Sequence, residues 1–159
     1  CADCDACFFC LGVTSVGLDE ATYTRLTYEL TTGVARVIVT PRMTICYVTG
    51  AGTDSTEQGS RMWARVKGRT ENALLAMPFR AAYMFRPGYI QPLKGVRSKT
   101  GWYQAIYNVV APLYPVLHAI APGSTTTTVE MGKAMIQVAA AGYAKRLLDP
   151  RDISALAQS

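Results

Sequence analysis

Short apolar segments alternate with helical segments along the first half of the chain, and this alternation constrains the fold more than any other feature. Residues 47–92 show it best: a strand ends in the turn TGAG at residues 49–52, a helix follows, and a second strand runs into the sequence RPG at residues 86–88. Strands and helices joined by short links predict right-handed crossovers and a parallel sheet. We therefore predict an α/β fold with its polar residues gathered where the strands end.

Three apolar stretches predict the strands of this sheet, at residues 5–12, 43–48 and 80–85. Nearly continuous apolar sequence is typical of a parallel strand that is buried on both faces, and we expect this of residues 5–12. Helices are expected at residues 20–39, after the N-cap Asp19, and at residues 60–76, because apolar residues recur there at helical spacing.

The sequence changes character after Pro87. A loop rich in glycine and proline precedes an aromatic and apolar stretch at residues 102–120, which we interpret as an irregular helical layer over the site. We predict one domain over residues 1–159, with the sheet and its helices in residues 1–92 and a substrate-side helical region in residues 93–159.

Three elements are predicted near the end of the chain. Thr127 and Glu130 have the spacing of a capping box, which opens a helix over residues 128–141. A short edge strand is expected at residues 145–148, and a last turn of helix at residues 152–157.

Length, charge and hydropathy limit the classes of partner. A chain of 159 residues can bury a core, and its net charge of +5 is spread over scattered basic residues. Such a charge suits a phosphate-bearing small molecule as well as it suits nucleic acid, and it is also typical of a solvated basic face. We expect a small-molecule substrate and no nucleic acid, and we leave open a homo-oligomer. No stretch reaches the roughly 18 apolar residues of a membrane span.

Four cysteines recur at every third position near the N-terminus. They are Cys1, Cys4, Cys7 and Cys10. The spacing is similar to part of an iron–sulfur motif, but residues three apart in a strand point to opposite faces, and no proline follows the last cysteine. We expect no metal and interpret these thiols as small buried side chains. Reduced thiols, together with an N-terminus that lacks the basic residues of a secretory signal, predict a cytoplasmic protein.

These segments resemble the later two-thirds of a short-chain dehydrogenase/reductase of the extended or atypical kind, from the NAD-dependent epimerase/dehydratase superfamily. The resemblance runs over almost the whole chain, and it is most specific in the sequence YVTGAG at residues 47–52, in Lys67-Gly68 with Glu71, and in FRPG at residues 85–88. It implies a partial Rossmann-like parallel sheet with a C-terminal helical layer, and binding of NAD or NADP.

The family's catalytic residues are a hydroxyl after one strand and a tyrosine four residues before a lysine on the next helix. By position, Thr49 matches the hydroxyl, Lys67 the lysine and Trp63 the tyrosine. The family's tyrosine is a general acid or base, and its lysine also binds the nicotinamide ribose. An indole N–H donates a hydrogen bond but does not titrate, so this dyad lacks ordinary proton transfer.

The resemblance also implies which residues lie against the cofactor. They are Gly12, Val13 and Thr14 after the first strand, Lys67, and Arg86, Pro87 and Gly88 after the third. Two structural alternatives stay open: Arg86 could pair with an acidic residue, and Lys67 could be a surface lysine whose apolar stem packs on the protein. His118 is the only histidine, and we interpret it as a surface or helix-end residue.

The family's glycine-rich phosphate loop has no counterpart in this sequence. We therefore expect the chain to begin inside a Rossmann domain, without roughly three strands and their helices, and to bind dinucleotide weakly by itself. The predicted function is an NAD(P)-binding oxidoreductase or epimerase acting on a carbonyl or hydroxyl compound. The alternatives are a non-catalytic dinucleotide-binding or redox-sensing module, and a fragment without activity.

Overall fold

Four parallel strands form the central sheet of the computed structural model, which describes residues 4–91 and 125–158. The strands lie in the order β1-β2-β3-β6. Their bounds are β1 Ala6–Phe9, β2 Thr44–Val48, β3 Ala81–Phe85 and β6 Leu147–Leu148. The predicted α/β class with a parallel sheet is confirmed, and it is consistent with a partial Rossmann-like fold. The helical layer expected at residues 102–120 lies outside the described residues.

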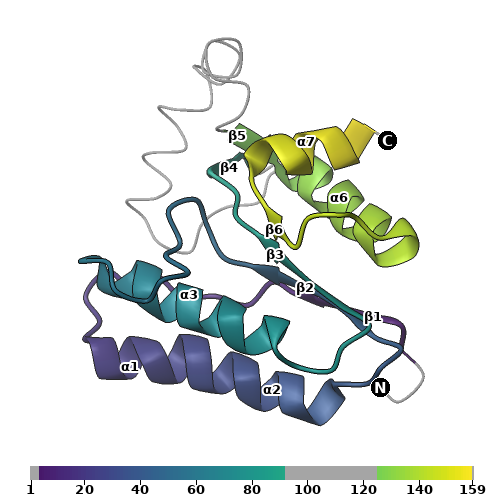
Figure 1. Ribbon diagram of the computed structural model, residues 1–159. Coiled ribbons are helices and arrows are strands. Elements are labelled where there is room, and N and C mark those ends of the chain that lie inside the picture. Colours follow the sequence, from purple (N-terminus) through teal and green to yellow (C-terminus); the bar gives the residue numbers. More distant parts are fainter. Residues whose placement is uncertain (1–3, 92–124, 159) are drawn as a thin grey trace.

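Helices cover both faces of the sheet (Figure 1). One face carries α1 (Glu20–Thr24), the π-helical segment η1 (Arg25–Glu29), α2 (Leu30–Ile38) and α3 (Met62–Leu75). The other face carries α6 (Thr128–Ala141) and α7 (Pro150–Gln158).

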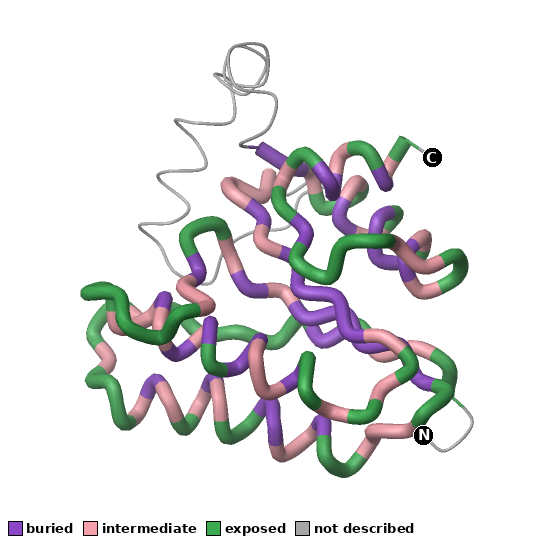
Figure 2. The backbone as a smooth tube through the Cα atoms, viewed as in Figure 1, coloured by how far each residue is buried: buried purple, intermediate pink, exposed green. Residues whose placement is uncertain are grey.

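The strands distribute their side chains between two apolar cores. Ile45 and Tyr47 pack in the core that contains Leu74 of α3, whereas Cys46 packs with residues of α6 and α7. This division follows from the alternation of side chains along a strand. Buried residues are therefore concentrated on the middle strands (Figure 2).

The helix predicted at residues 20–39 forms, but it contains a π-helical segment. Asp19 is the N-cap, as predicted, and its carboxylate accepts a hydrogen bond from the Thr22 amide at 2.8 Å. In η1 the Leu30 amide donates to the carbonyl of Arg25, five residues back. The Thr32 hydroxyl donates to the Tyr28 carbonyl at 2.8 Å, which is the kind of local competition that distorts threonine-rich helices.

The burial predicted for the first strand is wrong. Strand β1 lies at the edge of the described sheet, pairs only with β2 there, and buries only Phe9. Phe8 is 45% exposed, and Cys10 is exposed rather than packed in a core. The residue types suited a strand covered on two faces, but within the described residues only the face toward α2 and α3 is covered.

The end of the chain contributes strands as well as helices. The capping box is confirmed, with the Thr127 hydroxyl accepting from the Glu130 amide at 3.1 Å, and α6 has the predicted bounds. Strand β6 pairs with β3 at the edge of the main sheet. A second, two-stranded parallel sheet of β4 (Tyr89–Gln91) and β5 (Thr125–Thr127) was not predicted. No helix in the described residues is long and apolar enough to cross a membrane.

Candidate functional site

The turns that follow β2 and β3 are bonded to each other at the carboxyl edge of the sheet. The two strands are parallel neighbours, so the segments that follow them leave the sheet at the same edge. The Thr49 amide donates to the Phe85 carbonyl at 2.8 Å, and the Ala51 amide donates to the Pro87 carbonyl at 2.7 Å. The predicted site residues after β2 and after β3 therefore lie side by side, at the edge where open α/β sheets bind ligands.

Lys67 reaches this edge from α3. Its ammonium donates a hydrogen bond to the backbone carbonyl of Thr49 at 2.7 Å. Burial lowers the pKa of Lys67, and the negative charge of Glu71 raises it. The side chain is half-buried and its ammonium is anchored to the backbone, so the alternative of a lysine whose apolar stem packs on the protein stays open beside the predicted ligand contact.

The Thr49 hydroxyl is directed into the protein. It lies 2.6 Å from a carboxylate oxygen of Glu71 and 3.1 Å from the Phe85 carbonyl. A hydroxyl has one proton to donate, and both neighbours are acceptors. The match of Thr49 to the family's catalytic hydroxyl stays a prediction, and the structure places the hydroxyl proton between two protein acceptors.

Glu71 is a fully buried carboxylate held by Arg86. The Arg86 Nε donates to Glu71 at 3.0 Å, and Nη2 donates to the second carboxylate oxygen. Nη2 also donates to the Ser55 hydroxyl at 2.5 Å. This is the acidic partner considered as an alternative for Arg86. Loss of either member of such a pair would leave the other charge buried, at a cost of about 3–5 kcal/mol.

We call Thr49, Ser55, Lys67, Glu71 and Arg86 the Glu71 cluster. It joins the end of β2, the helix α3 and the end of β3. Lys67 and Arg86 carry two positive charges against the one negative charge of Glu71. The cluster therefore keeps a single positive charge beside the carboxyl edge, which suits a polar or anionic ligand.

Trp63 occupies the position one turn before Lys67 and covers the turn after β2. A Cβ atom placed on Gly52 would lie 3.5 Å from the edge of the indole ring. Gly52 has φ of 86°, a left-handed conformation that glycine adopts without strain. Trp63 is half-buried, and its contact with the turn is a packing contact.

Gly68 allows the polypeptide after β2 to touch α3. A Cβ atom at this position would lie 1.7 Å from the Asp54 carbonyl oxygen. The Asp54 amide donates to the Ala64 carbonyl at 3.1 Å, and the Asn72 side chain donates to the Ser55 carbonyl at 3.0 Å. The segment that carries Ser55 is thus fixed against the helix that carries Lys67 and Glu71.

The remaining predicted cofactor contacts lie around this arrangement. Gly12, Val13 and Thr14 form an exposed segment that follows β1, the neighbour of β2. The Thr14 hydroxyl accepts from the Val16 amide at 3.2 Å. Pro87 is buried and Gly88 half-buried beside the Gly50 turn. The structure brings together four of the predicted residues, Thr49, Lys67, Arg86 and Pro87. Residues 12–14 leave the sheet at the same edge, because β1 is parallel to β2.

Sequence reasoning assigned no role to Glu71 or Ser55. One signal for Glu71 was present, because it lies four residues after Lys67 and so falls on the same side of α3. The contact from Ser55 depends on how the turn folds back, and sequence spacing carries no sign of it.

The cysteines give no metal centre in the described part of the chain. No group of three or more histidine, cysteine, aspartate or glutamate side chains there is arranged to hold a metal ion. Partial removal from water raises the pKa of the Cys7 thiol, and of the Cys10 thiol although that residue is exposed overall; at Cys7 its cysteine neighbours make a smaller contribution. Such thiols are predominantly neutral at physiological pH.

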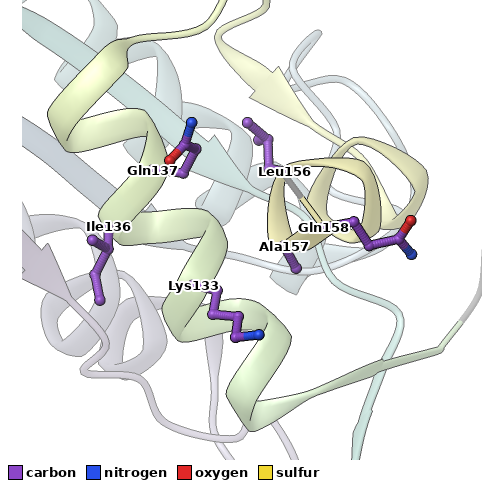
Figure 3. Close-up of a pocket in the computed structure, with 6 residues that line it drawn as sticks. All are labelled: Lys133, Ile136, Gln137, Leu156, Ala157 and Gln158. Atoms are coloured by element: carbon purple, nitrogen blue, oxygen red, sulfur yellow. The ribbon is translucent and has the colours of Figure 1, made fainter.

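A shallow cavity of about 390 Å³ lies between α6 and α7 (Figure 3). Its lining residues are Lys133, Ile136, Gln137, Leu156, Ala157 and Gln158. These helices cover the face of the sheet opposite to α3, so the cavity has no part in the site.

No protein-family model matches the chain, and no curated protein matches it either.

Proposed function

We propose that this chain forms the nicotinamide-ribose side of an NAD(P)-binding protein of the oxidoreductase or epimerase class. The observation that carries the proposal is the Lys67 ammonium, which α3 holds at the carboxyl edge of a parallel sheet. Ligands of open α/β sheets bind in the crevice beyond the carboxyl ends of the strands. A half-buried, anchored cation there is suited to a ligand rich in hydroxyl and phosphate oxygens.

The residues at this edge fit the nicotinamide ribose. An ammonium group has three N–H donors, and the Thr49 carbonyl uses one of them. The other two suit the paired hydroxyls of a ribose. Residues 12–14 would lie beneath the sugar, and Pro87 and Gly88 would line its side. The bound cofactor would supply hydride transfer, which protein side chains do not perform.

The proposed setting is cytoplasmic, and the proposed partner is a small carbonyl or hydroxyl compound rather than nucleic acid. The modest and scattered positive charge supports a small molecule. A homo-oligomer is compatible with this proposal and is not required by it.

A second candidate function is dinucleotide binding without turnover, as in a redox sensor. Two observations favour it. The indole of Trp63 does not titrate, and the Thr49 hydroxyl lies among the acceptors Glu71 and Phe85. The two groups that match the family's hydroxyl and tyrosine are therefore unsuited, as placed, to move a proton on a substrate.

Titration of the full-length protein with NADH and NADPH tests the proposal. Lys67→Met should weaken binding about 10-fold to 100-fold, because a hydrogen bond from a charged group contributes about 1.5–3 kcal/mol. Lys133→Met is the matched control, since Lys133 is exposed on α6, and it should bind as the wild type does. Equal affinities for wild type and Lys67→Met would contradict the assignment.

Hydride transfer to a panel of carbonyl compounds separates the two candidates. Turnover that is lost in Lys67→Met supports the oxidoreductase. Binding that depends on Lys67, without turnover on any compound, supports the non-catalytic module.

A further inference from the structure

Thr49 is held from three directions, and each contact comes from a different part of the fold. Its amide donates to the Phe85 carbonyl of β3, its hydroxyl lies against Glu71 of α3, and its carbonyl accepts from Lys67. Thr49 therefore links the two charged residues: its hydroxyl is held by Glu71, and its backbone carbonyl accepts the hydrogen bond from the Lys67 ammonium. A movement of the Glu71 carboxylate should therefore move the Thr49 carbonyl oxygen, which accepts the hydrogen bond from Lys67.

Glu71 is itself fixed by a planar donor. Arg86 donates through Nε and Nη2 to the two carboxylate oxygens, and the same Nη2 donates to Ser55. Paired hydrogen bonds between guanidinium and carboxylate define orientation as well as distance. Because Arg86 directly follows β3, the carboxylate of α3 is tied to the sheet that carries Thr49.

From these contacts we propose that Glu71, oriented by Arg86, is a positioning residue that holds Thr49 and thereby places the Lys67 ammonium at the carboxyl edge of the sheet. The inference rests on the proposed function in taking Lys67 as the ligand-binding cation. The hydrogen bonds that join Arg86, Glu71, Thr49 and Lys67 form within the protein itself, so the positioning role of Glu71 can be tested in the absence of a bound ligand.

The charges agree with the geometry. Burial disfavours the charged form of Lys67 and lowers its pKa, while Glu71, one helical turn away, opposes this effect. Arg86 is the other charged member of the cluster, and its charge is matched by Glu71 at hydrogen-bonding distance. Glu71 thus favours the ammonium form that a ribose-binding lysine needs.

Carbon NMR of the full-length protein with ¹³Cε-labelled lysine tests the inference, and Lys67→Arg identifies the Lys67 signal. In Glu71→Gln the titration midpoint of Lys67 should fall below that of the wild type, because the opposing negative charge is gone. Glu57→Gln is the matched control: Glu57 is an exposed glutamate that contacts Asn72, and this variant should leave the Lys67 signal unchanged.

If Glu71→Gln does not fold, a second pair of variants tests whether Glu71 positions Lys67 through Thr49. Thr49→Val removes the hydroxyl that Glu71 holds but keeps the charge pair, and it should shift the Lys67 signal. Thr49→Ser keeps the hydroxyl and should restore the wild-type signal. Wild-type position and midpoint of the Lys67 signal in the folded Thr49→Val protein would overturn the inference and leave Glu71 with Arg86 as a purely structural pair. Failure of NADH to bind would instead count against the proposed function alone.

Discussion

Gly68 is a residue at which α3 and the turn after β2 lie too close for a side chain. Gly68→Ala would place a methyl group 1.7 Å from the Asp54 carbonyl oxygen, so the backbone has to move. We expect a loss of about 1–3 kcal/mol in the free energy of unfolding, measured by urea denaturation. Gly132→Ala is the matched control, because Gly132 also lies inside a helix and has open space at this position.

The control should stabilise the protein by about 0.5–1 kcal/mol, since alanine favours a helix more than glycine does. Equal effects of the two substitutions would show that helix propensity, and not the contact with Asp54, governs Gly68.

At the scale of single residues, the sequence indicated which side chains would gather at the carboxyl edge of the sheet, but not the hydrogen bonds among them. Lys67 and Thr49 were singled out by their positions on a helix and after a strand, and the structure joins them through one hydrogen bond. The pairing of Glu71 with Arg86 joins residues fifteen positions apart. It depends on the angle at which α3 crosses the sheet, and no local pattern encodes that angle.

Among the elements, α6 has the most clearly defined start. Its capping box consists of Thr127 and Glu130, and the Glu130 carboxylate also accepts from the Thr127 amide at 2.7 Å. Thr127→Ala should lower the free energy of unfolding by about 1 kcal/mol, because a helix amide loses its acceptor. Thr127→Ser keeps the hydroxyl and should stay within a few tenths of a kcal/mol of the wild type. Urea denaturation measures both, and an equal loss in the two variants would exclude the cap as the cause.

Elements defined by local signals were predicted well, and those defined by tertiary contacts were not. Apolar spacing predicted α3 to within two residues at each end, and the capping box predicted the bounds of α6. Strands β4 and β5 have three residues each and pair across more than thirty intervening positions, so neither shows a strand pattern by itself. The π-helical segment η1 depends on a shift in hydrogen-bond partners that helical spacing does not reveal.

For the whole molecule, stability should fall steeply at alkaline pH. Burial raises the pKa of Tyr47 from 10 to about 12 and that of Cys46 from 9 to about 12. The unfolded chain therefore loses these protons first as the pH rises. The stability that depends on these two protons is complete below about pH 9 and is lost toward pH 12. Between its pKa in the unfolded chain and its pKa in the folded protein, each group lowers the free energy of unfolding by on the order of 1.4 kcal/mol per pH unit.

Urea denaturation between about pH 8 and about pH 11 measures this loss. Tyr47→Phe and Cys46→Ala should each flatten the fall, because each removes one group whose pKa differs between the folded and unfolded states. Cys4→Ser, at an exposed position, is the control and should follow the wild type. Tyr47 and Cys46 face different cores, so the two variants test the effect of burial on each face of the sheet separately. Unchanged slopes in both variants would contradict the prediction.

The order of the strands also has a consequence for synthesis. Strand β3 is paired on one side with β2, which precedes it, but on the other side with β6, some sixty residues later. The helices that cover the side of the sheet containing Cys46, Tyr83 and Phe85 likewise follow residue 124. On the ribosome, residues 4–91 can cover one side of their sheet with their own helices before the described residues that cover the other side are made. A nascent chain at this stage displays aromatic side chains beside an unpaired strand edge, which is the kind of surface that promotes aggregation until its covering helices are made.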